Sequence, residues 1–449
     1  MRLALPEPHI PEKGGFTSEN NIFGYHEFAE RLANLVSNVK EPLVITLDGP
    51  WGSGKSVFIK QWAGLMRDRG GNIVYFDAFA NDFHSNAFLA LASEIYSIAK
   101  KTLGGNNPSS KKFLNKAKKI GEVITSRGSG IALRFITAGT VNPEDIEAAV
   151  KAFKNEPEKA ISEKLQKADE ERASLEAFRD SLIDVSKSIA KKNQGTGQSL
   201  PLIFIVDELD RCRPPFSLDI IEHIKHFFSV ENICFVLVTN LSQMEAIIKN
   251  TYGSETNAHI YLEKFYQLKI VLPEPDIGQN QRNKYLNHLS SKLNLKFGDN
   301  LPSEIAFDEI NHLANAHTLS LRQIEHMMRN IVLIAASLIE KQMPCLPVTA
   351  GLCIMRQTHP KLYALARENS LPWKDVEEFL KIDGIKYRTD VVNHWKYIIG
   401  HDIPEEIITQ YSETLNRCYQ SIRLPRDRRL LQHILTNDID SLLGNHSNE

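Results

Sequence analysis

The stretch that decides the fold is Gly49-Pro-Trp-Gly-Ser-Gly-Lys-Ser56, which has the G-x-x-x-x-G-K-S spacing of a phosphate loop. A short β-branched run over residues 42–48 precedes it, and residues 57–66 are apolar at helical spacing. Strand, glycine-rich loop and helix are the context that this motif requires. The sequence therefore predicts a binding site for the phosphates of a nucleoside triphosphate.

The loop residues have separable tasks. Its glycines let backbone N–H groups curl around phosphates, and the helix that follows directs the positive end of its dipole at them. We expect Lys55 to reach the β- and γ-phosphates and Ser56 to ligate Mg²⁺. The expected nucleotide-binding set is the whole loop and the residue after it: Gly49, Pro50, Trp51, Gly52, Ser53, Gly54, Lys55, Ser56 and Val57.

A second motif ends in adjacent carboxylates. Residues 200–211 read as a continuous apolar strand that runs into Asp207 and Glu208, the pattern of a Walker B strand. Asp207 is expected to hold the Mg²⁺ shell, and Glu208 to polarise the attacking water as the catalytic carboxylate. For Asp210 and Arg211 two interpretations stay open: action across a subunit interface, or a structural ion pair near the site.

A third strand, over residues 233–240, ends in the polar pair Thr239 and Asn240. These residues are expected to lie between the phosphate loop and the Walker B carboxylates. There the side chain of Asn240 could orient the nucleophilic water. The alternative is that Asn240 only forms the turn after the strand.

The order of elements indicates an α/β fold. A helix over residues 27–39 precedes the phosphate-loop strand, and a strand over residues 72–77 and a helix over residues 87–101 follow the loop. Alternation of strands and helices predicts a parallel sheet in a three-layer α/β/α arrangement, with ligands at the carboxyl ends of the strands. The expected domains are a leader (1–15), the nucleotide-binding domain (16–280), a helical lid (281–345) and a helical C-terminal domain (346–449).

An insertion interrupts the alternation over residues 102–198. Its charge-rich second half carries apolar residues at spacings of three and four, which is the stripe of a helix that packs on another helix. Two interpretations remain, a helical hairpin within the chain and a surface for a partner or for self-association. The stripe consists of Leu175, Phe178, Leu182, Val185 and Ile189.

The C-terminal third is expected to be helical. A helix that starts in residues 319–330 carries Arg322 and Arg329, and Arg322 is a candidate to contact the γ-phosphate and to couple nucleotide state to a lid. The alternative for both arginines is a solvated helix charge. The basic loop at residues 423–429 could contact phosphate or an acidic partner, although a solvated charge run is the favoured interpretation.

Composition limits the classes of function. The 449 residues include 53 basic and 55 acidic side chains for a net charge of −2, which gives no overall attraction to nucleic acid or to an anionic membrane. Five scattered cysteines favour a reducing, cytoplasmic setting over a disulfide framework or a zinc site. No signal peptide or membrane span is expected, because the longest uncharged run, residues 342–355, is too short and carries prolines.

Four segments together resemble the KAP family of P-loop NTPases: the phosphate loop, residues 202–211 with their Asp-Glu-Leu-Asp-Arg ending, residues 236–240, and Tyr261-Leu-Glu-Lys-Phe-Tyr-Gln-Leu-Lys-Ile-Val-Leu-Pro273. Asn21-Ile-Phe-Gly-Tyr-His26 also looks like the family's N-terminal helix motif. The resemblance covers roughly residues 16 to 335. It departs at Tyr25-His26, where members often have an arginine, and at Asp77-Ala-Phe79, where they often have Asn-Ala-Trp.

The resemblance implies ATP as the nucleotide, in line with the lack of an N/T-K-x-D guanine motif. It also makes a role in defence against phage or plasmids an expectation, since bacterial relatives are often linked to it. Three functions follow: a Mg²⁺-dependent ATPase that works as a switch or assembly component, an ATP-gated scaffold with little hydrolysis that holds an effector, and, less favoured, an ATPase that acts on nucleic acid. A homo-oligomer or an effector protein, contacted through the insertion and the C-terminal region, is the expected partner.

Overall fold

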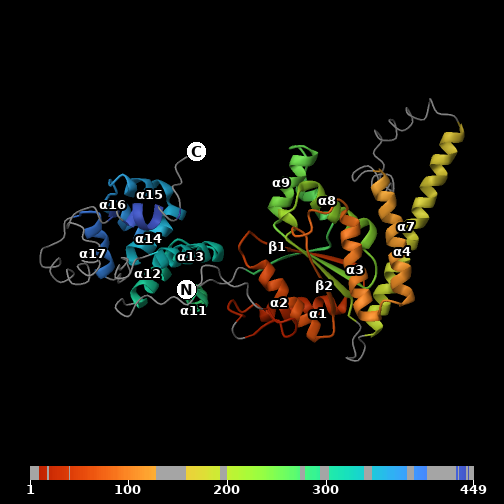
Figure 1. Cartoon of the computed structure of the whole chain (residues 1–449), viewed down its shortest axis with the longest axis horizontal. Helices are drawn as coiled ribbons and strands as arrows, with labels where there is room; N and C mark the ends of the chain where they lie inside the picture. Colours follow the sequence, from red (N-terminus) through yellow and green to blue (C-terminus); the bar gives the residue numbers. More distant parts are fainter. Residues whose placement is uncertain are drawn as a thin grey trace. The chain divides into compact units, whose positions relative to one another are not determined.

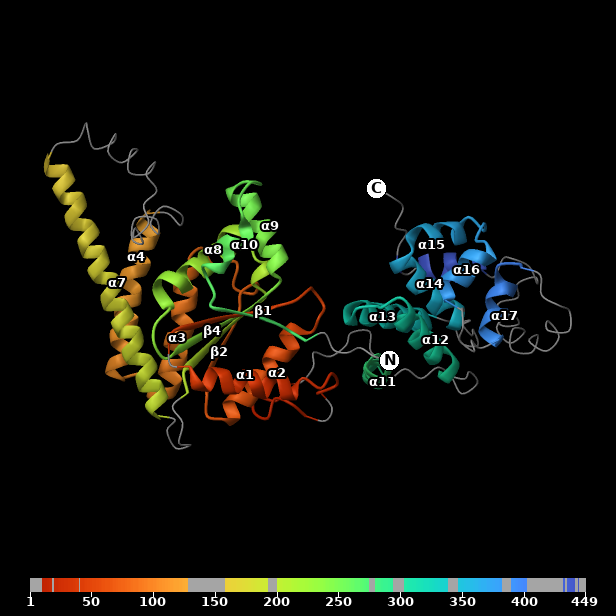
Figure 2. The same ribbon diagram turned by 180° about the vertical axis from the view of Figure 1, so that it is seen from behind.

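The computed structural model describes residues 10–17, 20–39, 41–127, 158–192, 200–273, 279–293, 303–337, 346–381, 389–401, 431–432, 434–440 and 443 (Figures 1 and 2). The chain divides into two compact units. One comprises residues 10–273, and the other comprises residues 274–449 together with 1–9. Each unit is described by itself below.

The first unit is built on a parallel five-stranded sheet with the strand order β2-β3-β4-β1-β5. Each strand of the central three is almost or fully buried, as their apolar runs predict. Because β4 lies between β1 and β3, the phosphate-loop strand and the Walker B strand are not neighbours. The strands are β1 (Leu43–Asp48), β2 (Asn72–Asp77), β3 (Leu202–Asp207), β4 (Ile233–Thr239) and β5 (Leu268–Val271).

Helices cover both faces of this sheet, so the predicted three-layer α/β/α fold is confirmed (Figure 1). On one face α1 (His26–Asn38) and α2 (Lys55–Asp68) pack with the N-terminal segment around Trp62, which is fully buried. On the other face the core includes α3 (Ala87–Leu103) and α8 (Pro214–His223). Alternate residues of β1, β2, β3 and β4 contribute to the two cores, as the period of two requires, whereas β5 contributes to one core only.

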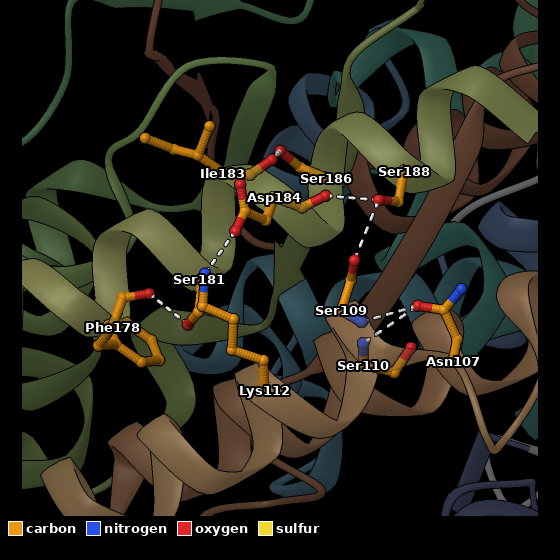
Figure 3. A network of polar contacts seen from close by, with 10 residues as sticks. All are labelled: Asn107, Ser109, Ser110, Lys112, Phe178, Ser181, Ile183, Asp184, Ser186 and Ser188. Atoms are coloured by element: carbon orange, nitrogen blue, oxygen red, sulfur yellow. Dashed lines mark hydrogen bonds and ion pairs between the residues drawn. The ribbon is translucent and has the colours of Figure 1, made fainter.

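The insertion contributes a helical hairpin that packs on α3. It consists of α4 (Pro108–Arg127) and α7 (Glu158–Lys192), which lie side by side in both views (Figures 1 and 2). Polar contacts join the two helices (Figure 3): Lys112 Nζ lies 2.7 Å from Asp184 Oδ2, and the hydroxyls of Ser109 and Ser188 are 3.4 Å apart.

The apolar stripe of α7 faces into the chain. Phe178 is fully buried and packs against Phe88 of α3 and Phe113 of α4, with ring centroids 5.2 and 5.6 Å apart. The other stripe residues belong to the same core, Leu175 as a partly buried member. Of the two interpretations, the hairpin within the chain is therefore the one that the structure shows. The side chains of the stripe are used in this core and do not form an exposed apolar face for a partner.

The segment after β3 combines three kinds of helix. A 3₁₀ turn at η2 (Leu209–Arg211) follows β3, α8 begins at Pro214, and the last turn widens into a π-helix, η3 (Ile224–Phe228). Proline at the first helical position favours the start of α8 at this residue. After β4 come α9 (Leu241–Tyr252) and α10 (Ala258–Glu263), which lead into β5.

In the second unit the described residues form helices, as the sequence predicts. The helices expected as a lid and those expected as a C-terminal domain pack together here, because α12 and α13 both contact α14. His312 Nε2 of α12 also lies 2.8 Å from the carbonyl oxygen of Leu380 in α16. The described helices are α11 (Gln279–Leu293), α12 (Ser303–Ala316), α13 (Leu321–Ser337), α14 (Leu346–Thr358), α15 (Pro360–Arg367), α16 (Trp373–Leu380), α17 (Thr389–Ile398) and the π-helix η4 (Ile434–Asp440).

The basic loop at 423–429 lies outside the described residues, as do residues 1–9 of the leader and residues 128–157 and 193–199 of the insertion. Among the helices that the structure does describe, none combines the length and the apolar character needed to cross a bilayer.

Candidate functional site

The phosphate loop joins β1 to α2 at the carboxyl edge of the sheet. Gly52 and Gly54 have φ angles of 81° and 87°, in the region that favours glycine, so both positions require a residue without a Cβ. A Cβ on Gly49 would lie 3.1 Å from Ser53 Oγ, which is tighter than an ordinary contact. The loop is thus shaped by its glycines, as the motif predicts.

Lys55 is turned back onto the loop. Its Nζ donates to the carbonyl oxygens of Gly49 and Pro50, at 2.5 and 3.0 Å. Burial lowers the pKa of Lys55, and the carboxylates of Asp210, Asp207 and Asp48 act in the opposite direction. A buried ammonium group held by carbonyl oxygens is suited to exchange them for phosphate oxygens, which carry negative charge.

Ser53 supports the fit of a phosphate group in this loop. Its Oγ is buried and has no hydrogen-bond partner within the part of the chain that the structure describes. Buried hydroxyls rarely stay unpaired, since the loss costs about 1–3 kcal/mol. A phosphate oxygen in the loop would supply the missing partner.

Asp207 is the centre of the Walker B site. Its Oδ1 accepts from Ser56 Oγ at 3.2 Å and from the backbone N–H of Glu208 at 2.8 Å, and its Oδ2 accepts from the hydroxyl of Tyr75 at 2.6 Å. Burial raises the pKa of Asp207, while these three hydrogen bonds lower it. The fold therefore brings the two expected Mg²⁺ ligands, Ser56 and Asp207, into contact across 151 residues of sequence.

This pair fits a magnesium ion. A hydroxyl and a carboxylate oxygen are hard oxygen donors, and Mg²⁺ in nucleotide sites is held by one or two such groups together with phosphates and waters. When bound, the ion would neutralise charge on the phosphates.

Glu208 directly follows the strand in a left-handed conformation, with φ of 60°. Non-glycine residues seldom adopt this region, and at functional sites it often aims a side chain. Its Oε1 lies 2.7 Å from Arg211 Nη1. Burial raises the pKa of Glu208, Arg211 lowers it, and Asp77 and Asp207 raise it further. Of the two interpretations of Arg211, the structure shows the ion pair near the site, with Glu208 as the partner.

The end of β4 lies between the two motifs, as the sequence predicts. Asn240 precedes α9, and its side-chain oxygen accepts from the backbone N–H of Ser242 at 3.2 Å. The residue therefore caps this helix, which is the turn-forming role that competed with water orientation. Whether its amide nitrogen also orients a water stays a prediction.

Trp51 and Thr239 share one acceptor. The indole N–H of Trp51 and the hydroxyl of Thr239 both donate to the carboxylate of Asp210. Arg322, by contrast, lies exposed on α13 in the second unit. Arg329 of the same helix is 3.8 Å from Glu325. The contact expected between Arg322 and the γ-phosphate stays a prediction.

Comparison with protein families identifies the family of this chain. The model of the KAP family P-loop domain matches residues 25–338, which is more than half of the chain. The chain belongs to the KAP family. The match begins just before α1 and ends after α13, so the KAP domain includes the whole sheet with its phosphate loop and also the first helices of the second unit.

Two further comparisons add less. Among solved structures, this KAP protein is similar to the ORC2 protein of Aeropyrum pernix, determined in ADPNP-ADP complexes, with a TM-score of 0.37, 12% identity and 98% of each chain covered. Comparison with curated proteins finds no match. The KAP family match and the phosphate loop together make this a nucleotide-binding fold.

Three side chains at this edge of the sheet make contacts that were not predicted from the sequence. The sequence predicts a strand at Tyr75 and no role for its side chain, yet its hydroxyl donates a hydrogen bond to Asp207. Asp48, the last residue of β1, accepts from the backbone N–H of Leu241 at 2.9 Å and lies 3.0 Å from Lys269 Nζ. Asp82 accepts from the backbone N–H and from Nε of Arg213, both at 2.9 Å. The sequence signal that could have identified such side chains is a polar residue at or near the carboxyl end of a predicted strand.

Proposed function

We propose that this KAP protein binds ATP together with Mg²⁺ and hydrolyses it, and that the cycle works as a switch for assembly or for a partner protein. The observation that carries the proposal is the contact of Ser56 with Asp207 at 3.2 Å, beside Glu208. A hydroxyl and two carboxylates lie next to the loop that would hold the phosphates, which supports the proposed roles in metal binding and hydrolysis.

Each residue has a defined task in this proposal. Lys55 leaves its two carbonyl acceptors and binds phosphate oxygens, while Ser56 and Asp207 hold the magnesium ion. Glu208 accepts a proton from the attacking water or orients it. Its side chain is 20% exposed, so it is within reach of water and still partly desolvated.

The test is phosphate release from ATP by the purified protein. Lys55→Ala is expected to weaken ATP binding, and Glu208→Gln to retain binding but to lower turnover by about 100- to 10,000-fold, the range for loss of a general base. Lys112→Ala, on α4 of the hairpin, is a control for loss of a lysine away from the loop. Undiminished turnover in Glu208→Gln would remove Glu208 from the catalytic role.

A second function is favoured by one observation, the ion pair between Glu208 and Arg211. A carboxylate that stays paired with an arginine is a poor base, so the protein would then bind ATP and hydrolyse it little, as a nucleotide-gated scaffold for an effector. ATP binding without phosphate release, also in Arg211→Gln, would support the scaffold over the ATPase.

The defence role and the identity of the partner are proposals that rest on family membership. Expression of the chain in a host challenged with phage, with Lys55→Ala as the control, is the direct test of a defence role.

A further inference from the structure

Asp210 connects three separate parts of the nucleotide site. Its Oδ2 accepts from the indole N–H of Trp51 in the phosphate loop, and its Oδ1 accepts at 3.2 Å from the hydroxyl of Thr239, the last residue of β4. Asp210 itself lies in η2, directly after the Walker B strand. Both oxygens of one carboxylate are therefore used to join the loop to β4.

The position of Asp210 also affects Lys55. The residue is 9% exposed, and among the charged neighbours of Lys55 its carboxylate does most to oppose the lowering of the lysine pKa by burial. A buried carboxylate that accepts two hydrogen bonds is fixed in orientation, and such charge-assisted bonds are about twice as strong as neutral ones.

Trp51 is anchored to Asp210 by its indole N–H. The residue is 48% exposed, although large apolar side chains are usually covered. Because so much of the residue faces solvent, little packing holds the indole, and its bond to Asp210 would contribute much of its orientation. Loss of the acceptor would release the indole and, with it, the outer part of the phosphate loop.

We propose that Asp210 is a positioning residue for the nucleoside triphosphate, which fixes the phosphate loop through Trp51 and couples the loop to the end of β4 through Thr239. The proposal rests on the nucleotide site proposed above and deepens it. The metal and the water are assigned to Asp207 and Glu208. Asp210 acts through its two neighbours and does not touch the reacting atoms.

The first experiment is a double-mutant cycle on the full chain. We expect Asp210→Ala to weaken ATP binding, measured by calorimetry, about tenfold, as for loss of a hydrogen-bonded charge. Trp51→Phe is expected to weaken it in the same direction. Because both changes remove the same contact, the double variant is expected to bind about as weakly as Asp210→Ala alone. The proposal would be overturned if the loss of ATP affinity in the double variant equalled the product of the losses in the two single variants.

Two further variants keep the result interpretable. Asp210→Asn keeps the shape and one acceptor oxygen, so it is expected to fold and to bind ATP between wild type and Asp210→Ala. Asp184→Asn removes a carboxylate from the hairpin, where it is paired with Lys112, and is expected to leave ATP binding unchanged. Wild-type affinity in Asp210→Asn and Asp210→Ala would overturn the positioning role.

The second experiment reads Trp51 directly and needs no nucleotide. The fluorescence of Trp51 is obtained by subtracting the emission of the matching Trp51→Phe variant, in the wild-type and in the Asp210→Ala background. Quenching of this fluorescence by acrylamide is expected to be stronger in Asp210→Ala than in wild type. Unchanged quenching would show that Asp210 does not hold the indole and would overturn the proposal. Failure of the wild type to bind ATP would instead overturn the proposed function, and with it the positioning role, whatever the quenching shows.

Discussion

Glu208 and Arg211 face each other across a single 3₁₀ turn, with Oε1 and Nη1 2.7 Å apart. The pair joins the residue assigned as the catalytic carboxylate to the arginine three positions later. The backbone of Glu208 is in the left-handed region, with φ of 60°. The state of the proposed base therefore depends on whether Arg211 stays bound to it.

Arg211→Gln is expected to shift the pH profile of ATP hydrolysis. Burial raises the pKa of Glu208 and Arg211 lowers it, so loss of the arginine leaves the pKa higher. A base must be ionised, and the acid limb of kcat/KM should therefore move to higher pH. The measurement is phosphate release between pH 5 and 9. Arg329→Gln, which removes an arginine paired with Glu325 on α13, is the matched control. An acid limb that does not move would separate Arg211 from Glu208.

Tyr75→Phe is expected to weaken magnesium binding at neutral pH. The hydroxyl of Tyr75 donates to Asp207 at 2.6 Å and lowers its pKa against the effect of burial. Without it the pKa of Asp207 rises, and a protonated carboxyl binds Mg²⁺ poorly. Titration of ATP binding with Mg²⁺ should show a higher midpoint, and raising the pH should restore it. Tyr96→Phe on α3 serves as the control, and equal midpoints in the two variants would contradict this role.

Leu182→Ala is expected to destabilise the protein far more than Leu35→Ala. Leu182 of α7 is fully buried in the core under the hairpin, whereas Leu35 of α1 is 38% exposed. The same atoms are deleted, so the difference measures burial: about 2–5 kcal/mol for Leu182 against about 1 kcal/mol or less for Leu35. The free energy of unfolding in urea gives both values. Similar small losses would mean that the α7 stripe is not part of the core.

The contiguous motifs explain how much was predictable from the sequence. The phosphate loop and the strand that ends at Asp207 are each set by neighbours in sequence, through glycine spacing and an apolar run. The fold could therefore be predicted, as could the position of both motifs at one edge of the sheet. The placement of Thr239 and Asn240 followed from the rule that parallel strands end at the same edge of a sheet.

The contacts that sequence reasoning missed are long-range ones. Tyr75 and Asp207 are 132 residues apart, and their bond depends on the register that pairs Asp77 with Asp207 in β2 and β3. Trp51 and Asp210 are 159 residues apart. The strand β5 was missed for another reason. It has four residues at the sheet edge and alternates between half-buried and exposed, so it lacks the apolar run that identified β1, β3 and β4.

Asn240→Asp is expected to separate the two roles of this residue. The side-chain oxygen caps α9 by accepting from Ser242 N–H, and aspartate keeps that acceptor. Aspartate lacks the amide N–H donors, which are what a water-orienting role requires. We therefore expect wild-type stability with much reduced phosphate release, whereas Asn240→Ala should lose the cap as well, at a cost of about 1 kcal/mol. Thermal unfolding and phosphate release measure the two effects independently. Full turnover in Asn240→Asp would leave Asn240 as a helix cap alone, and the water would then be oriented by Glu208 without help from β4.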